Sequence, residues 1–219
     1  MTCPGCTGGA NVFGDKAARS NLKSYRKNGP AKNTRILLDA LRREGVEGRT
    51  LLDIGGGVGA ISMELLKSGV TSATQVDAST AYVAAANAEA AREGVSDRFA
   101  ARQGDFVALA PETPAADVVT LDRVICCYPD MRALVSESAG KAARLYGVIY
   151  PRDTWWARMG GATLNAVARL FRVPLRNHIF PTAAVDAVIR EQGLTRRYQH
   201  DAFYWQVVVY GRPVEGLTP

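Results

Sequence analysis

Short apolar runs alternate along this chain with segments in which apolar residues recur every three or four positions. Short apolar runs predict buried strands at residues 50–54, 74–77, 98–103 and 117–122. Apolar residues at three- and four-residue spacing predict helices between and after them, at residues 60–68, 80–93 and 131–146. Strands that alternate with helices form a parallel sheet joined by right-handed crossovers. The first two thirds of the chain therefore predict an α/β fold.

The last third continues this alternation and then changes it. It predicts a strand at residues 147–150, a helix at 155–171, a helix at 182–192 capped by Thr182, and strands at 194–198 and 204–210. In the helix at 155–171, five residues are expected to face a core: Met159, Leu164, Val167, Leu170 and Phe171. The final two strands follow each other around a turn at Asp201, so we expect an antiparallel hairpin.

Length and composition indicate one domain spanning residues 1–219. The chain has 219 residues, of which 47% are hydrophobic, enough for a sizeable core. Within it we expect a flexible tail at residues 1–12 and an N-terminal helical cap at residues 13–46. No apolar run approaches the roughly 20 residues of a membrane span, and the first nine residues lack the apolar core of a secretory signal. We therefore expect a cytoplasmic protein without a transmembrane segment.

A formal net charge of +6 raises the question of an anionic partner. Part of the excess lies on one predicted helix face, formed by Lys16, Arg19, Lys23, Arg26 and Lys27. Three interpretations stay open for this stripe: a solvated face, attraction of an acidic substrate, or peripheral contact with an anionic membrane. Nucleic acid is not the expected partner, because the chain has neither an RNA-binding appendage nor an Asn/Asp-Pro-Pro-Tyr/Phe signature. A small-molecule substrate is expected instead, and the sequence does not define the oligomeric state.

The turn after the first strand carries the strongest chemical signal. Gly55, Gly57 and Gly59 alternate there, two residues after Asp53. Glycines can take positive φ and let a ligand lie against bare backbone. Gly55, Gly57 and Ala60 also satisfy the dinucleotide fingerprint, with an acid twenty residues after Gly57. An NAD(P)-dependent oxidoreductase is therefore an alternative on this motif alone.

Asp53 and the three glycines resemble the D-x-G-x-G-x-G motif of class I S-adenosylmethionine-dependent methyltransferases. The resemblance implies a Rossmann-like, seven-stranded, mostly parallel sheet with helices on both faces and an antiparallel C-terminal hairpin, which the plain dinucleotide fold lacks. It also implies S-adenosylmethionine as cofactor and S-adenosylhomocysteine as product. Asp53 would accept from a ligand ammonium or orient the loop. The other implied cofactor residues follow later strands: Asp77 and Ala78 at the ribose, Asp105 at the adenine amino group, Phe106 against the ring, and Asp122 near the substrate.

The stretch from Leu121 to Pro129 resembles the magnesium-protoporphyrin O-methyltransferases more narrowly. Those enzymes tend to carry His-Tyr-Pro where this chain has Cys127, Tyr128 and Pro129. The predicted reaction is methyl transfer to an O, N or S nucleophile of a small molecule, with a carboxylate of a flat or acidic substrate as one acceptor. The candidate catalytic residues are Tyr25, Cys127, Tyr128 and His178, and Trp155 is expected to join the acceptor pocket.

The cysteines allow a further interpretation. Cys3 and Cys6 have C-x-x-C spacing in the glycine-rich tail, and no metal site is expected there. Cys126 and Cys127 are either small apolar residues that close a strand or the soft-ligand site of a thiol or metalloid methyltransferase. A catalytically silent cofactor-binding module, acting through a partner, is the remaining alternative.

Overall fold

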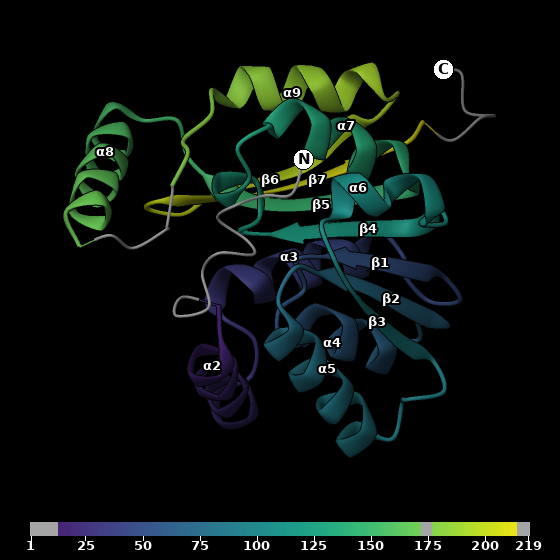
Figure 1. Ribbon diagram of the computed structural model, residues 1–219. Helices are drawn as coiled ribbons and strands as arrows, with labels where there is room; N and C mark the ends of the chain where they lie inside the picture. Colours follow the sequence, from purple (N-terminus) through teal and green to yellow (C-terminus); the bar gives the residue numbers. More distant parts are fainter. Residues whose placement is uncertain (1–12, 172–176, 214–219) are drawn as a thin grey trace.

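The computed structural model describes residues 13–171 and 177–213, which form a seven-stranded sheet with helices on both faces (Figure 1). The strand order across the sheet is β3-β2-β1-β4-β5-β7-β6. The strands are β1 (Thr50–Ile54), β2 (Ser72–Asp77), β3 (Phe99–Gln103), β4 (Ala116–Asp122), β5 (Ala142–Pro151), β6 (Thr195–Asp201) and β7 (Trp205–Gly211).

The pairing divides the sheet into a parallel and an antiparallel part. Strands β1 to β5 pair in parallel, whereas β7 runs antiparallel to both β5 and β6. In the central strands nearly every side chain is buried, as expected of a sheet covered on both faces. The predicted fold class, including the closing antiparallel hairpin, is confirmed.

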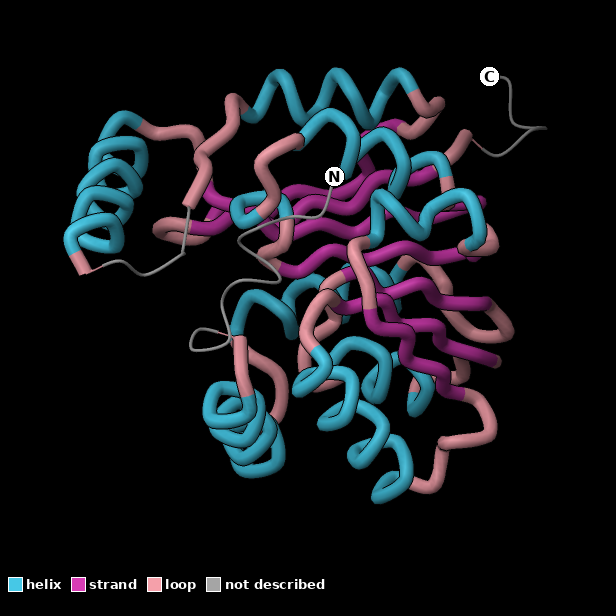
Figure 2. Tube along the Cα trace, viewed as in Figure 1, coloured by secondary structure: helices cyan, strands magenta, loops and turns pink. Residues whose placement is uncertain are grey.

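Two groups of helices enclose the sheet (Figure 2). One face is covered by α3, α4 and α5, with α2 packed on α5, and the other by α6, α7 and α9. In Figure 1, α8 stands apart from both layers, beyond the carboxyl ends of the parallel strands. The α-helices are α2 (Asp15–Asn28), α3 (Lys32–Arg43), α4 (Ala60–Lys67), α5 (Thr80–Glu93), α6 (Phe106–Leu109), α7 (Met131–Gly140), α8 (Trp155–Leu170) and α9 (Thr182–Glu191). Two 3₁₀ turns complete the described elements, η1 (Ala110–Glu112) and η2 (Ile125–Cys127).

Local chemistry explains several helix starts near the carboxyl edge of the sheet. The side chains of Ser79, Asp105, Asp130 and Thr154 each accept a hydrogen bond from a first-turn N–H of the helix that follows. Such caps satisfy amide groups that have no partner inside the helix. They fix where α5, α6, α7 and α8 begin and hence where the loops before them lie.

The helix predicted at residues 131–146 is wrong in its last part. Helix α7 ends at Gly140, and Ala142 already pairs with Ala116 as the first residue of β5. Gly140 is a poor helix former, and Tyr146 is fully buried between β4 and β7, where its hydroxyl bonds to Ser138. Burial in the sheet therefore outweighs the apolar spacing that suggested a longer helix.

Three smaller predictions also differ from the structure. Thr182 is not the N-cap of α9: Pro181 holds that position, and the Thr182 hydroxyl accepts from Gln206 instead. Asp201 is the last residue of β6, so the hairpin turns after it. Of the five residues of helix 155–171 expected in a core, all are exposed, because α8 buries its small residues Ala157, Gly161 and Ala168.

Residues 13–46 contribute the helices α2 and α3 to the fold. Leu37, Leu38 and Leu41 of α3 are buried against β5 and β7, and α2 packs on α5 with Ala18 and Tyr25 buried in the same core cluster. The tail at residues 1–12 lies outside the described residues. Among those that are described, no helix is long and apolar enough to cross a bilayer.

Candidate active site

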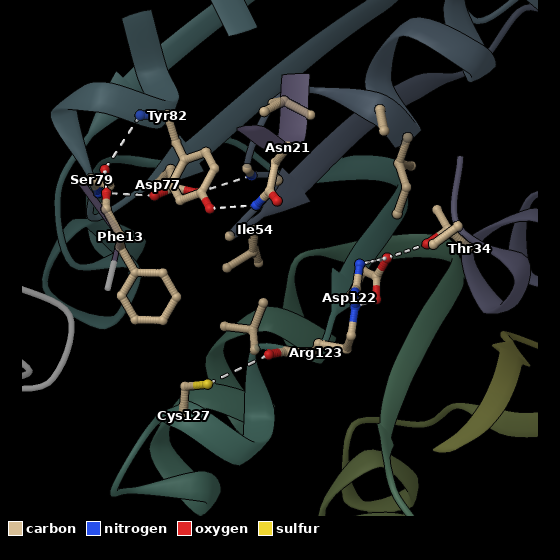
Figure 3. A pocket seen from close by; sticks show the side chains of 18 of the residues that line it. Phe13, Asn21, Thr34, Ile54, Asp77, Ser79, Tyr82, Asp122, Arg123 and Cys127 are labelled. Carbon is tan, nitrogen blue, oxygen red and sulfur yellow. Dashed lines mark hydrogen bonds and ion pairs between the residues drawn. The ribbon is translucent and has the colours of Figure 1, made fainter. Parts of the chain in front are cut away.

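A cavity of about 1100 Å³ opens at the carboxyl ends of the parallel strands (Figure 3). The residues after β1, β2, β3 and β4 form its floor, α2 borders it, and Gly160 and Leu164 of α8 reach it from outside the sheet. Apolar atoms predominate in the lining, with a few converging polar groups. Ligand sites in open α/β sheets lie at this edge, so the cavity is the candidate active site.

The glycine turn after β1 adopts the backbone that the sequence predicts. Gly55, Gly57 and Gly59 have φ values of +63°, +57° and +80°. A Cβ on Gly55 would lie 2.5 Å from Val124 Cγ2, which leaves no room for a side chain. Gly55 and Gly57 line the cavity, whereas Gly59 lies behind them as the N-cap of α4. The turn therefore presents bare backbone to a ligand.

Asp77 ends β2 and holds this turn in place. Its Oδ2 accepts the Gly57 N–H at 2.9 Å, and its Oδ1 accepts the Ser79 N–H at 2.8 Å. Burial raises the pKa of Asp77, while these two hydrogen bonds oppose the rise. A carboxylate has about four acceptor positions, so two remain at the cavity wall, next to Ala78. This is where the family resemblance places the ribose hydroxyls.

Asp53 lies under the turn and does not line the cavity. It is fully buried, and its oxygens accept from the Thr120 hydroxyl at 2.8 Å and the Ser62 hydroxyl at 3.3 Å. Burial raises its pKa to about 7. A Cβ on Gly56 would lie 2.6 Å from Asp53 Oδ2, so the carboxyl supports the loop from below. Of its two predicted roles, this placement fits loop orientation and not contact with a ligand ammonium.

Asp105 and Tyr128 are brought together on the opposite wall. Asp105 Oδ1 accepts the Val107 N–H as the N-cap of α6, and the Tyr128 hydroxyl donates to both carboxylate oxygens at 3.0 and 3.1 Å. Phe106 is buried beside them and lines the cavity. The predicted adenine-binding residue and a predicted catalytic residue therefore form one hydrogen-bonded unit, and the Tyr128 hydroxyl points to Asp105.

Asp122, at the end of β4, anchors a charged corner of the cavity. It accepts from the Thr34 hydroxyl at 2.6 Å and from Arg123 Nε at 2.7 Å. Arg123 has a φ of +61°, the single positive value among the described non-glycine residues. Non-glycine residues with positive φ are uncommon, and those that occur are concentrated at functional sites. Figure 3 shows the Arg123 side chain lying against Asp122 within the cavity lining.

The remaining candidate catalytic residues differ in their access to the cavity. Tyr25 lines the cavity, but its hydroxyl donates to Glu64. Burial raises the pKa of Tyr25, and the negative charge of Glu64 raises it as well. Cys126 and Cys127 also line the cavity, with their sulfur atoms 3.8 Å apart. The pKa of Cys127 is lowered by its hydrogen bond with Cys126 and by the positive charge of Arg123. Cys127 is therefore the more acidic of the two thiols.

Two residues predicted for the acceptor side, Trp155 and His178, do not line the cavity. Trp155 is 74% exposed on α8 and faces away from the lining, so its expected place in the acceptor pocket is wrong. His178 is not in the lining either: its ring stacks on Phe180, and its backbone N–H donates to the Cys126 carbonyl. Its neighbour Asn177 lines the cavity and donates to the Tyr204 hydroxyl at 2.7 Å.

Sequence reasoning missed several lining residues that come from distant segments. Asn21 of α2 donates to the Tyr82 hydroxyl at 2.6 Å, although the two are 61 residues apart. Thr34 and Asp122 are 88 residues apart. Arg123 carried a usable signal, since it directly follows the acid that ends β4. The other missed polar residues of the lining are Ser24, Asn28, Arg35, Ser79, Asn177 and Tyr204.

A comparison with known protein families matches the middle part of the chain. Residues 51–141, from β1 to the start of β5, match the family model of a methyltransferase domain. This segment holds the glycine turn, Asp77, Asp105 and the Cys126-Cys127 pair. The segments that complete the cavity, α2 and α8, lie outside the match.

Solved structures resemble the whole chain. Magnesium protoporphyrin IX methyltransferase from Synechocystis PCC 6803, with bound S-adenosylhomocysteine, is 18% identical with a TM-score of 0.65, over 94% of this chain and 86% of that one. An O-methyltransferase family protein from Burkholderia thailandensis is 17% identical, with a TM-score of 0.68, over 91% of this chain and 60% of that one. A putative sarcosine dimethylglycine methyltransferase from Galdieria sulphuraria is 12% identical, with a TM-score of 0.66, over 83% and 85%.

These findings decide between the two cofactor families that the glycine turn allowed. The antiparallel β6–β7 pair is present, and the nicotinamide-dependent oxidoreductase is not favoured. At these sequence identities the solved structures establish the fold alone, and the family model identifies a methyltransferase domain at residues 51–141. Residues 51–141 are therefore a methyltransferase domain, and the whole chain has the fold of class I S-adenosylmethionine-dependent methyltransferases.

Proposed function

We propose that this enzyme transfers the methyl group of S-adenosylmethionine to an O, N or S atom of a small molecule, and that Asp77 binds the ribose of the cofactor. The single observation that carries the proposal is the Asp77 carboxylate. It is fixed by two backbone N–H groups and keeps two acceptor positions at the cavity wall, beside glycines with positive φ. Two vicinal hydroxyls fit such a group.

The rest of the cofactor follows from this anchor. The adenine lies towards Asp105 and Phe106 after β3, with its amino group donating to the carboxylate. The methionine part runs along the backbone of Gly55 and Gly57 towards Asp122. The sulfonium methyl then points into the part of the cavity bordered by α2, α8 and the Cys126-Cys127 loop.

The chemistry needs little from the protein beyond alignment. A lone pair of the acceptor forms a bond to the methyl carbon while the carbon–sulfur bond breaks, and its electron pair stays on sulfur as neutral S-adenosylhomocysteine. Holding the two reactants in line contributes up to roughly 7–11 kcal/mol. A carboxylate acceptor is ionised near neutral pH and requires no base.

The acceptor side favours an acidic substrate. Arg35 and Arg123 both line the cavity, and for Arg35 the described residues provide no acidic partner. The volume of about 1100 Å³ exceeds the 300–1,000 Å³ typical of one drug-sized ligand. The cavity therefore accommodates a cofactor together with a second small molecule, whose acidic group would pair with a guanidinium.

The first experiment separates the cofactor classes by equilibrium binding. Isothermal titration calorimetry should detect S-adenosylhomocysteine binding and no comparable binding of NAD or NADP. Tight NAD(P) binding without affinity for S-adenosylhomocysteine would end the proposal. Methyl transfer is then measured with a labelled methyl donor over porphyrin carboxylates, other carboxylic acids, phenols and amines. Transfer to none of these by a cofactor-binding enzyme would favour the silent binding module instead.

The acceptor class is tested with paired substrates and matched variants. A carboxylic acceptor should react and its uncharged primary amide should not. Arg35→Gln should raise KM for the acid by roughly tenfold or more, as expected when a charged hydrogen bond is lost. Arg19→Gln, the same change on the outer face of α2, should leave KM unaltered. Equal rates for acid and amide would refute the acidic-substrate assignment.

A second acceptor class is favoured by one observation, the two cavity-lining thiols 3.8 Å apart. Soft thiolates bind soft ions, so trivalent arsenic belongs in the same screen. Arsenite methylation that Cys127→Ser abolishes, while S-adenosylhomocysteine affinity is retained, would assign this activity. Absence of arsenite methylation in the wild-type enzyme would exclude it.

A further inference from the structure

Helix α8 exposes an unusual amount of apolar surface. Trp155 is 74% exposed, Met159 63% and Leu170 77%. Of the seven large hydrophobic residues that are prominently exposed in the described chain, Phe203 is the one that lies away from this helix and its C-terminal cap. Monomeric proteins rarely leave such residues gathered in one place. The concentration on one helix therefore calls for a partner.

The helical geometry places these residues on the side turned away from the protein. The helix buries Ala157, Gly161 and Ala168. Trp155, Met159 and Leu170 project from the opposite side at a period of 3.6 residues. An ordinary surface helix has the reverse arrangement, with large apolar residues inside and polar residues outside. In Figure 1 the helix stands beyond the sheet edge, so its outer side is turned to the surroundings.

The patch extends beyond the helix itself. Phe203, in the turn between β6 and β7, is 82% exposed and stacks on Trp156 with ring centroids 4.6 Å apart. Phe171, at the C-terminal end of α8, is 71% exposed. Aromatic residues therefore stand at both ends of the patch, and such residues favour the boundary between lipid and water.

The charges of α8 have one sign. Residues 155–170 contain Arg158 and Arg169 and no acidic residue. Arg158 pairs with Asp153, whereas Arg169 has no ion pair with any described residue. Both arginines lie on the same flank of the apolar side. Helix α2, which also borders the cavity, adds further exposed cations: Lys16, Arg19, Lys23 and Lys27.

We propose that the outer side of α8 docks on an anionic lipid surface, lying in the interface plane. Large apolar residues on one side, flanked by cations, are the features of an interfacial helix. The helix has 16 residues and so spans about 24 Å, which suits lying on a bilayer and not crossing it. A second copy of the chain is the poorer occupant, because two such helices would bring arginines together with no acid on either.

Docking on this side places the cavity next to the lipid. Gly160 and Leu164 of the same helix line the cavity, so the helix separates the two. An acidic acceptor with an apolar body, held at the membrane surface, would then reach the site along α8. The docking itself is independent of the methyl acceptor, and its test uses no activity measurement.

The test is flotation of the full chain with lipid vesicles. The protein should float with phosphatidylcholine vesicles that contain phosphatidylglycerol and much less with pure phosphatidylcholine. Met159→Glu combined with Leu170→Glu should lower the partition coefficient at least about tenfold, because two large apolar side chains no longer enter the interface. Arg169→Gln should lower it on the anionic vesicles alone, by a smaller factor.

The matched control adds the same charges elsewhere. Ala183→Glu combined with Ala187→Glu on the exposed side of α9 should float like the wild type. Retained S-adenosylhomocysteine binding and an unchanged unfolding midpoint show that both double variants are folded. The proposal is overturned if the wild type floats with neither vesicle, or if the α8 variant floats as well as the wild type. It is equally overturned if sedimentation velocity shows a wild-type dimer that the α8 variant converts to monomers.

Discussion

Replacing Asp77 by Asn tests the central contact of the proposed cofactor site. The substitution keeps the shape of the side chain and exchanges one acceptor oxygen for an NH₂ group. In the enzyme, one carboxylate oxygen accepts the Gly57 N–H and the other accepts the Ser79 N–H. The amide of Asn can serve one of these groups and one ribose hydroxyl at most. The variant therefore loses at least one charge-assisted hydrogen bond to the cofactor.

The size of the effect follows from the bonds lost. Hydrogen bonds to charged groups contribute about 1.5–3 kcal/mol each. Losing one such bond weakens cofactor binding by about 1.5–3 kcal/mol, which is roughly 10- to 150-fold in Kd, and losing a second weakens it further. Stability should change less, by about 1 kcal/mol. The reason is that the lost backbone bond is offset by removal of a charge whose burial raises the pKa of Asp77.

A thermodynamic cycle isolates the ribose contact. Calorimetry measures S-adenosylhomocysteine and its 2′-deoxy counterpart against the wild type and Asp77→Asn. The wild type should prefer the ribose ligand by roughly tenfold or more, and the variant should largely lose this preference. Asp97→Asn, which removes an exposed carboxylate, controls for net charge.

Two results would refute the reasoning. One is an equal preference for the ribose ligand in the wild type and in Asp77→Asn, because Asp77 then does not contact the hydroxyl. The other is a loss of affinity matched by an equal loss of stability without ligand, because the substitution then acts through the loop alone.

Three further predictions concern the loop, the α2 contact and the buried carboxyl. Gly55→Ala should lower the free energy of unfolding more than Gly94→Ala does. Gly94→Ala meets only the penalty of about 1–2 kcal/mol for positive φ, whereas the Cβ added at residue 55 would also lie 2.5 Å from Val124. Equal losses in urea unfolding would contradict the clash. Arg26→Ala should cost about 1–2 kcal/mol by the same measurement, because the Glu89 side chain it binds is fully buried, whereas Lys23→Ala should change stability by less than about 0.5 kcal/mol. Asp53 keeps its proton up to a pKa of about 7 when folded but releases it near 3.8 when unfolded, so its contribution to stability falls as pH rises between these values, by up to about 1.4 kcal/mol per pH unit. Asp53→Asn should remove that slope between about pH 4 and 7, and unchanged pH dependence would show that Asp53 is ionised in the fold.

The elements that the sequence predicts well are those determined by their own residues. Gly55 and Gly57 can adopt positive φ because glycine has no Cβ, and Asp77 meets Gly57 because parallel strands end at one edge. The apolar spacing wrongly predicted a helix at residues 142–146, because pairing with β4 and β7 makes this segment a strand. The motif leaves two roles open for Asp53, and it does not reveal that the side chain is fully buried beneath the turn.

The far side of the cavity depends on contacts between distant segments. Nothing around Asn21 indicates that it meets Tyr82, because the docking of α2 on α5 depends on side chains 61 residues apart. For α8 the apolar spacing correctly predicted a helix, but the large apolar residues face solvent and not the core. Its protein-facing side consists of Ala157, Gly161 and Ala168, so small residues, and not large ones, mark the buried side.

The attachment of α2 has a consequence for protein engineering. This helix is fastened to the layer below it by side chains, chiefly Tyr25 to Glu64 and Arg26 to Glu89, and it forms no ladder with the sheet. A library that retains these anchors and the Asn21–Tyr82 contact, and randomises Ser24 and Asn28, which line the cavity, would alter the acceptor wall alone. The methyl-donor half would remain intact, so new substrate ranges could be selected by exchanging one helix while the catalytic framework stays constant.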